Sequence, residues 1–220
     1  MLVGMALIWL GGSGRADIFN GSFELSDPVN GFGVKPPTGW KSNNYTNTVS
    51  RLNMSFITGD PNNWNPDILE NGLDPYEGDY LVLLSTESNV RPDRIGYARL
   101  SQEITIQGGE RISGVYFFGT CDYQPFDDYA EIQLLADPNT MVDPNNITLA
   151  RISISTPGID SYGSTVGWEY FEHSFSQKQA GKYTLVIGVY DEIDLVYNSY
   201  LAVDALNLCE TPEKLSLIHI

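Results

Sequence analysis

Short runs of apolar residues, some alternating with polar ones and some unbroken, recur along this chain. In 130–134 apolar and polar side chains alternate, which is the pattern of a strand buried on one face. The runs 79–85 and 112–118 are largely apolar through their centres, as in strands buried on both faces. In 183–189 every second residue is apolar. The pattern therefore predicts β-strands.

Five further segments have the same character and are predicted to be strands: 49–57, 97–106, 147–155, 168–175 and 200–208. Turn-forming clusters of Gly, Pro, Asn and Asp separate the runs. No long window has a helical period, although 65–73 has room for one helical turn. About ten strands without a linker predict an all-β fold, a single antiparallel β-sandwich of jelly-roll type over residues 17–210.

Composition adds a strong acidic bias to this picture. The 220 residues include 12 Lys and Arg against 28 Asp and Glu, a formal net charge of −16. Nucleic acid and anionic membrane surfaces are excluded as partners, because phosphate contacts need clustered basic residues. The 21 Gly, 12 Pro and 13 Tyr favour strands and turns over helices. A chain of this length can bury its own core without a metal or a disulfide.

Both ends of the chain are predicted to lie outside the domain. Residues 1–16 combine an uncharged apolar run with small residues, which indicates a secretory signal peptide that lacks its basic start. The run is too short to span a bilayer, and a buried first strand is the alternative. Residues 211–220 read as the start of a linker followed by 215–220, which match a translated sequencing adapter. We therefore expect an incomplete environmental (metagenomic) sequence with a non-native tail, against the alternative of a genuine apolar tail.

Two sets of motifs resemble exported proteins. The start Asn-Gly-Ser-Phe-Glu at 20–24, with Gly-Trp at 39–40 and a last strand at 200–206, resembles carbohydrate-binding-module-like (galactose-binding-like) jelly rolls. The segment 114–132 contains Phe-Phe, Asp-Tyr, Pro-Phe and an acidic-Tyr-Ala strand start. It resembles secreted bacterial proteins with a PEP-type (PEP-CTERM) sorting anchor, the substrates of exosortases. Residues 211–213 lie where the linker to such an anchor would begin.

The jelly-roll resemblance implies a structural Ca²⁺ that ties the first strand to the last, with Glu24 and Asp204 as ligands and carbonyls near Asn20 or Asp27 beside them. Ca²⁺ prefers such hard oxygen ligands. Asp204 alternates with apolar residues, so its carboxylate needs a partner that offsets desolvation. The alternative is that both carboxylates accept hydrogen bonds from turn amides.

A second acidic set follows other strands. It consists of Asp122, Asp127 and Asp128, with Asp191, Glu192 and Asp194 farther along the chain. The two groups would meet at one end of the sandwich, and solvated acidic loops are the alternative reading.

Sugar binding would need exposed aromatic rings beside polar groups, because a pyranose stacks its apolar face on such a ring. Trp64, in the polar loop 61–66, is the first candidate, and Tyr76 and Tyr123 are the next. Packing within its own loop is the alternative for Trp64. Trp40 and Trp168 are expected to fill the core.

Catalysis is not predicted. His173 is the only histidine outside the tail, and it lies in an alternating strand pattern that favours a cross-strand or surface role. The chain has no nucleophile elbow and no phosphate loop. Cys121 and Cys209 would allow one disulfide in an exported protein, a pairing that the sequence leaves open.

The sequence thus predicts a non-catalytic, extracellular or cell-surface protein that mediates adhesion or binds exopolysaccharide, with Ca²⁺ as a structural aid. Two alternatives remain open. One is the carbohydrate-binding module of a secreted glycoside hydrolase, and the other is a structural subunit of an extracellular filament or coat. No membrane insertion is expected within the domain, and the oligomeric state is not predicted.

Overall fold

The computed structural model describes residues 18–30, 34–43, 45–87, 96–141, 144–192 and 195–210. The predicted signal peptide at 1–16 and the predicted tail at 211–220 lie outside these described residues. No helix within the described ranges is long and apolar enough to cross a membrane.

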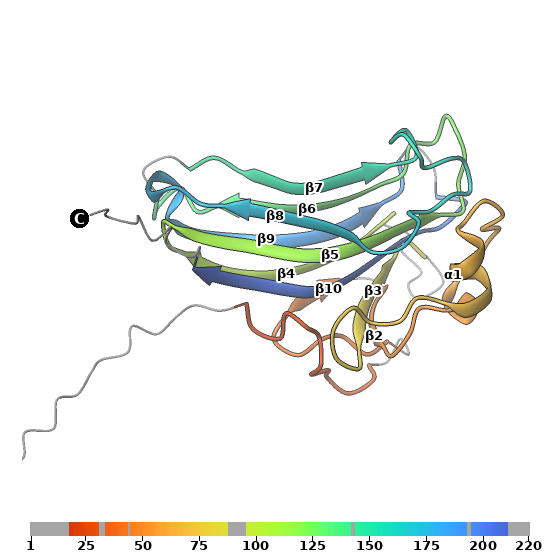
Figure 1. Cartoon of the computed structure of the whole chain (residues 1–220), viewed down its shortest axis with the longest axis horizontal. Coiled ribbons are helices and arrows are strands. Elements are labelled where there is room, and N and C mark those ends of the chain that lie inside the picture. Colours follow the sequence, from red (N-terminus) through yellow and green to blue (C-terminus); the bar gives the residue numbers. More distant parts are fainter. Residues whose placement is uncertain are drawn as a thin grey trace, which may run out of the picture.

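Ten strands form two five-stranded sheets in the described residues (Figure 1). They are β1 (Lys41–Asn43), β2 (Tyr45–Val49), β3 (Leu81–Ser85), β4 (Tyr97–Ile106), β5 (Glu110–Thr120), β6 (Tyr129–Ala136), β7 (Ile147–Ser153), β8 (Glu169–Ser174), β9 (Gly181–Tyr190) and β10 (Ser199–Glu210). The first sheet has the order β1-β4-β9-β6-β7 and the second β2-β3-β10-β5-β8. Every neighbouring pair is antiparallel. The predicted all-β sandwich is confirmed.

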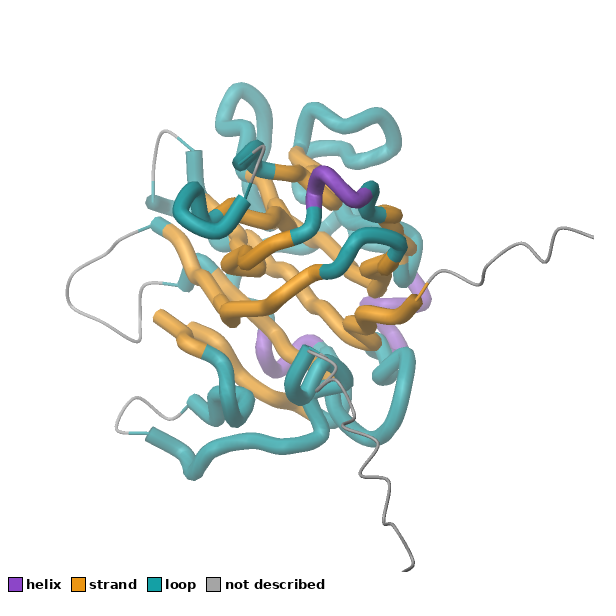
Figure 2. Tube along the Cα trace, turned by 90° about the vertical axis from the view of Figure 1, so that its left-hand side faces the viewer, coloured by secondary structure: helices purple, strands orange, loops and turns teal. Residues whose placement is uncertain are grey.

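The main core lies between the two sheets and follows from the alternation in the sequence. Every second residue of β4, from Ala98 to Ile106, is buried, and β6 buries Ala130, Ile132 and Leu134 in the same way. These side chains meet apolar residues of the second sheet such as Val203 in one cluster. Figure 2 shows the strands gathered in the centre, with loops and short helical turns around them.

A second, smaller core lies on the outer face of the second sheet. The connection from β2 to β3 carries the 3-10 turn η1 (Met54–Phe56) and the helix α1 (Pro66–Asn71), and it covers the sheet there. β3 is therefore buried on both faces, as its apolar run predicts. The predicted strand at 49–57 is wrong beyond Val49. The Asn53 side chain accepts a hydrogen bond from the Ser55 amide and starts a helical turn instead.

The helix α1 begins and ends at residues that suit those positions. The Asn65 side chain accepts a hydrogen bond from the Asp67 amide at 2.9 Å, and Pro66 occupies the first turn, where a missing N–H costs nothing. Gly72 ends the helix with φ at +79°. The predicted single helical turn in 65–73 is thus confirmed.

Trp64 belongs to this second core, which corrects its assignment as an exposed sugar-stacking ring. It is 2% exposed, and its ring lies 5.5 Å from Phe117 and 5.8 Å from Tyr200 between centroids. Its Nε1 donates to the Thr120 carbonyl at 2.8 Å. The ring also lies against Gly119, where a Cβ would be 2.4 Å from it. Although the loop at 61–66 is polar in sequence, the indole of Trp64 is buried. The alternative of packing is therefore correct, and sugar stacking on Trp64 is wrong.

We expect Trp64→Ala to lower the free energy of unfolding by about 3–5 kcal/mol, because it opens a cavity and leaves a carbonyl unpaired. Urea denaturation measures this loss. Tyr76→Ala serves as the control, since Tyr76 is 61% exposed and its removal should leave stability nearly unchanged. Equal stability of the Trp64→Ala variant and the parent protein would contradict the buried position.

Candidate functional site

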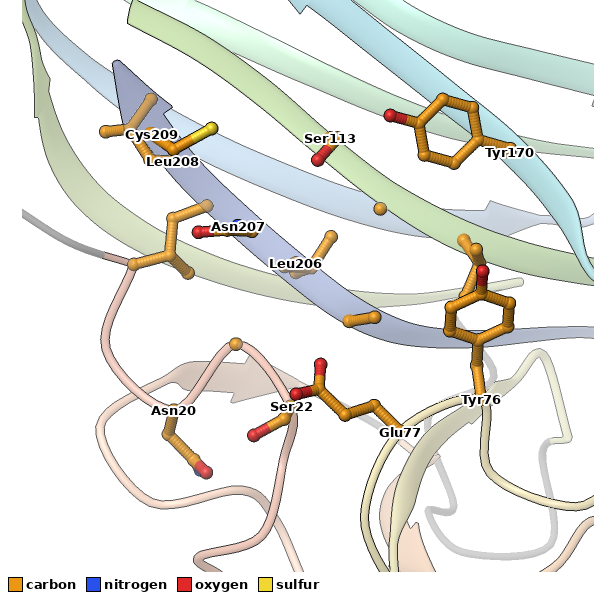
Figure 3. A pocket seen from close by; sticks show the side chains of 15 residues that line it. Asn20, Ser22, Tyr76, Glu77, Ser113, Tyr170, Leu206, Asn207, Leu208 and Cys209 are labelled. Atoms are coloured by element: carbon orange, nitrogen blue, oxygen red, sulfur yellow. The ribbon is translucent and has the colours of Figure 1, made fainter. Parts of the chain in front are cut away.

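A groove of about 680 Å³ opens on the outer face of the second sheet, next to the part that the β2–β3 connection covers. Three regions form its walls and floor (Figure 3): the N-terminal segment at 18–22, the turn at 76–77, and the strands β5, β8 and β10. The floor has a β-bulge in β10, because the register with β5 shifts between Asp204 and Asn207. The bulge widens the sheet locally and places Leu206 beside the segment at 18–22, where its amide donates to the Gly21 carbonyl.

Two exposed tyrosine rings border the groove. Tyr76 is 61% exposed and projects from the turn, and Tyr170 is 58% exposed and projects from β8 (Figure 3). The Tyr170 hydroxyl donates to Glu172 at 2.9 Å, and Arg111 contacts the same carboxylate at 3.2 Å. The position of the Tyr170 ring is therefore set by a short polar chain along the sheet, and its ring remains open to solvent.

Polar side chains lie between the two rings. Ser113 of β5 and Asn207 of β10 lie on the floor, and Glu77 enters from the turn (Figure 3). Asn20 also lines the groove, but its side chain already donates to the Leu25 and Thr38 carbonyls and accepts from the Leu25 amide. Asn20 therefore shapes the wall, while Glu77, Ser113 and Asn207 are left to contact a ligand.

The turn that carries Tyr76 is held by the two carboxylates that the sequence offered as calcium ligands. Asp204 Oδ2 accepts from the amides of Tyr76 at 2.8 Å and Glu77 at 3.0 Å. Glu24 Oε1 accepts from the amides of Asp79 and Tyr80, each at 3.1 Å. The N-terminal segment, through Glu24, and the last strand, through Asp204, thus both bind the backbone amides of the turn at 76–80. This is the arrangement that the sequence analysis gave as the alternative to a metal site.

Calcium does not fit this arrangement well. The second oxygen of Asp204 accepts from the Ala205 amide at 2.7 Å, and the second oxygen of Glu24 accepts from Asp79. Each carboxylate oxygen therefore faces N–H donors, whereas a calcium site surrounds the ion with oxygen ligands. Across the described residues, no group of three or more His, Cys, Asp or Glu side chains could hold a metal ion. Calcium at Glu24 and Asp204 stays an untested prediction.

Burial affects the ionisation of Asp204, which is fully buried. Desolvation raises the pKa of Asp204 to about 6, although the amide donors of Glu77, Ala205 and Tyr76 act in the opposite direction. The carboxylate is ionised at neutral pH, which makes it a strong acceptor for the turn amides.

Part of the second acidic set meets at one end of the sandwich. Asp122 and Asp128 are buried there, Asp127 and Asp191 are half-buried, Glu192 is exposed, and Asp194 lies outside the described residues. Asp122 follows β5, Asp128 precedes β6, and Asp191 follows β9. Asp128 is fully buried; Ser199 Oγ donates to its Oδ2 at 2.6 Å, and the Glu192 amide donates to its Oδ1 at 2.9 Å. Asp191 forms a side-chain hydrogen bond with Asp128. Desolvation raises the pKa of both carboxyls well above the ordinary range, and their mutual repulsion adds to this for Asp191.

Tyr123, the third predicted aromatic, lies beyond the end of β5 and does not line the groove. It is 37% exposed and packs in a cluster of rings, stacked on Tyr162 at 5.6 Å and edge-on to Phe126 at 5.3 Å and Tyr197 at 6.0 Å. The structure therefore brings Tyr76 into the groove and leaves Tyr123 and the buried Trp64 apart from it.

Tyr170 is the aromatic groove residue that sequence reasoning missed, along with the polar residues Glu77, Ser113 and Asn207. Its signal was present in 169–175, where Phe171 and Phe175 alternate with outward-facing residues. That alternation alone puts Tyr170 on the polar side of the strand, where a large aromatic residue is worth noticing.

The possible disulfide between Cys121 and Cys209 does not form, because the register of β5 with β10 keeps the two cysteines far apart. Cys209 pairs with Arg111 near the start of β5, whereas Cys121 follows its last residue, Thr120. At about 3.4 Å of rise per residue the two cysteines lie roughly 30 Å apart, and a disulfide requires Cα atoms within about 7 Å. Both cysteines are free thiols.

Comparisons with known proteins give structural similarity only. No protein-family model matches the sequence, and no curated protein matches it. The carbohydrate-binding module TmCBM61, solved in complex with beta-1,4-galactotriose, has a TM-score of 0.46 at 14% identity, covering 90% of this chain and 99% of that one. A cyclase from Fischerella sp. TAU has a TM-score of 0.44 at 13% identity, covering 89% and 96%.

The CBM22-1 xylan-binding domain of Paenibacillus barcinonensis Xyn10C has a TM-score of 0.36 at 11% identity, covering 80% of this chain and 87% of that one. Similarity at these scores carries no argument about function.

Gly78 lies in the turn that Glu24 and Asp204 hold, so a side chain there should disturb the Glu24 carboxylate. Its φ is +70°, and a Cβ there would be 2.3 Å from Glu24 Oε1. We expect Gly78→Ala to lower the free energy of unfolding by about 1–3 kcal/mol through backbone strain and displacement of Glu24. Gly158→Ala is the matched control, because Gly158 has φ at +92° with nothing within 4 Å of its Cβ. If thermal unfolding shows the same loss for both variants, the contact with Glu24 has no role.

The hydrogen-bonded carboxyls of Asp128 and Asp191 make stability depend on pH. A raised pKa means that the folded state binds protons more tightly than the unfolded chain, whose Asp titrates near 3.9. The contribution of Asp128 and Asp191 to stability is therefore fully present at low pH and is lost as the pH rises through their raised pKa values. We expect Asp191→Asn to flatten the fall of the melting temperature from pH 5 to pH 9. A variant profile parallel to that of the parent protein would show that the pair does not titrate as described.

Proposed function

We propose that this protein is a non-catalytic glycan-binding module and that the groove holds a polysaccharide segment between Tyr76 and Tyr170. The observation that carries the proposal is the pairing of these two exposed rings across a polar floor. Each ring offers an apolar face to a pyranose, and the hydroxyl groups of the sugar can bond to Ser113, Asn207 and Glu77.

The dimensions and construction of the groove support this reading. About 680 Å³ falls within the range of roughly 300–1,000 Å³ that is usual for small-ligand sites. Tyr170 lies on a strand, and Tyr76 lies on a turn whose backbone is fixed by Asp204 and Glu24. A fixed backbone under both tyrosines reduces the entropy that binding would otherwise cost.

The wider role belongs to the same proposal and draws on the sequence motifs. We infer an exported surface or matrix protein that adheres to exopolysaccharide, in line with the signal-peptide pattern at 1–16 and the motifs of 114–132. A module of a secreted glycoside hydrolase would use the same groove, so the sequence that follows this chain in the gene decides between the two roles.

The experiment is affinity electrophoresis and calorimetry with β-1,4-galactan, xylan and other neutral polysaccharides. We expect Tyr76→Ala and Tyr170→Ala each to weaken binding about tenfold, or about 1.4 kcal/mol, with unchanged melting temperatures. Tyr123→Ala is the matched control, an aromatic removal outside the groove. If Tyr123→Ala abolishes binding and the two groove variants do not, the site lies at the other end of β5 and the proposal is wrong.

A further inference from the structure

The charge of the groove is one-sided. Among the described residues that line it, Glu77 is the one charged residue and none is basic. Glu77 is exposed, and within the described residues its carboxylate has no hydrogen-bond or ion-pair partner. Figure 3 shows this side chain reaching from the turn toward Ser22. The carboxylate is thus available to a ligand.

The basic residue beside the groove is already engaged. Arg111 Nη1 contacts Glu172 at 3.2 Å, and its Nη2 lies 3.9 Å from the Cys209 sulfur. The ion pair with Glu172 offsets much of the Arg111 charge that an anionic ligand would otherwise meet. The carboxylate of Asp204 accepts a hydrogen bond from the Glu77 amide and adds further negative charge near Glu77.

The consequence for a ligand follows from Coulomb's law. A carboxylate or sulfate group on a sugar in the groove would lie near the Glu77 carboxylate without a compensating cation. At about 5 Å in a solvent-exposed setting, this repulsion weakens binding roughly fivefold, and added salt reduces the effect. A neutral sugar is not repelled. Its hydroxyl groups can donate to the Glu77 carboxylate, and a charged acceptor forms a stronger hydrogen bond than a neutral one.

We propose that the groove selects uncharged glycans over acidic ones and that Glu77 sets this selectivity. The inference rests on the proposed function, because it concerns the ligand class of the same groove. Glu77 accepts hydroxyl hydrogen bonds from a neutral sugar and repels uronate or sulfate groups. The ligand class is therefore a neutral polysaccharide, such as a galactan or xylan without acidic substituents.

The test uses two forms of one polymer, homogalacturonan with free carboxylates and the same backbone fully methyl-esterified, with β-1,4-galactan as a neutral reference. We expect the protein to bind the esterified form and the galactan at least fivefold more tightly than the free acid at low ionic strength. In Glu77→Gln the preference for the esterified form over the free acid should fall about fivefold.

Glu103→Gln is the matched control for net charge. Glu103 lies on β4 of the other sheet and pairs with Lys41 at 3.0 Å, with both side chains more than three-quarters exposed at 77% and 79%. It should keep the preference of the parent protein. Equal binding of both polymer forms by the parent protein, or an unchanged preference in Glu77→Gln, overturns the inference while leaving the proposed function in place. Failure to bind the esterified polymer and every neutral glycan overturns both.

Discussion

The groove depends on the hydrogen bonds that two carboxylates accept from the backbone amides of the turn at 76–80. Asp204 of the last strand accepts from the amides of Tyr76 and Glu77, and Glu24 of the N-terminal segment accepts from the amides of Asp79 and Tyr80. Asp204 is fully buried, and a buried charge needs such donors to offset its desolvation. These hydrogen bonds therefore join both ends of the domain to one turn and hold the backbone of Tyr76 at the edge of the groove.

The open groove is a consequence of uneven coverage of the second sheet. The β2–β3 connection buries the sheet around Phe117 and Tyr200 with its own apolar residues, including Trp64. Farther along β5 the coverage ends, and Ser113 and Tyr170 remain at the surface. The outer face of the second sheet thus has two regions. The apolar region is covered by the β2–β3 connection and stabilises the fold, and the polar region is open to a ligand.

Local pattern predicted the strands well because alternation reports burial directly, as in β4 and β6. It also singled out Tyr76, which is exposed at the edge of the groove. It failed where the answer depends on distant segments. The burial of Trp64 depends on Tyr200, and the separation of Cys121 from Cys209 depends on the register of β5 with β10. Neither can be read from neighbouring residues.

The most direct test of the account is an NMR titration of the protein with a neutral galactan oligosaccharide. We predict that the backbone amide signals of Tyr76, Glu77, Tyr170 and Asn207 shift together with one dissociation constant, while those of Tyr123 and Tyr162 stay unchanged. Shifts confined to Tyr123 and Tyr162, or none at any concentration, would contradict a glycan-binding groove on the second sheet.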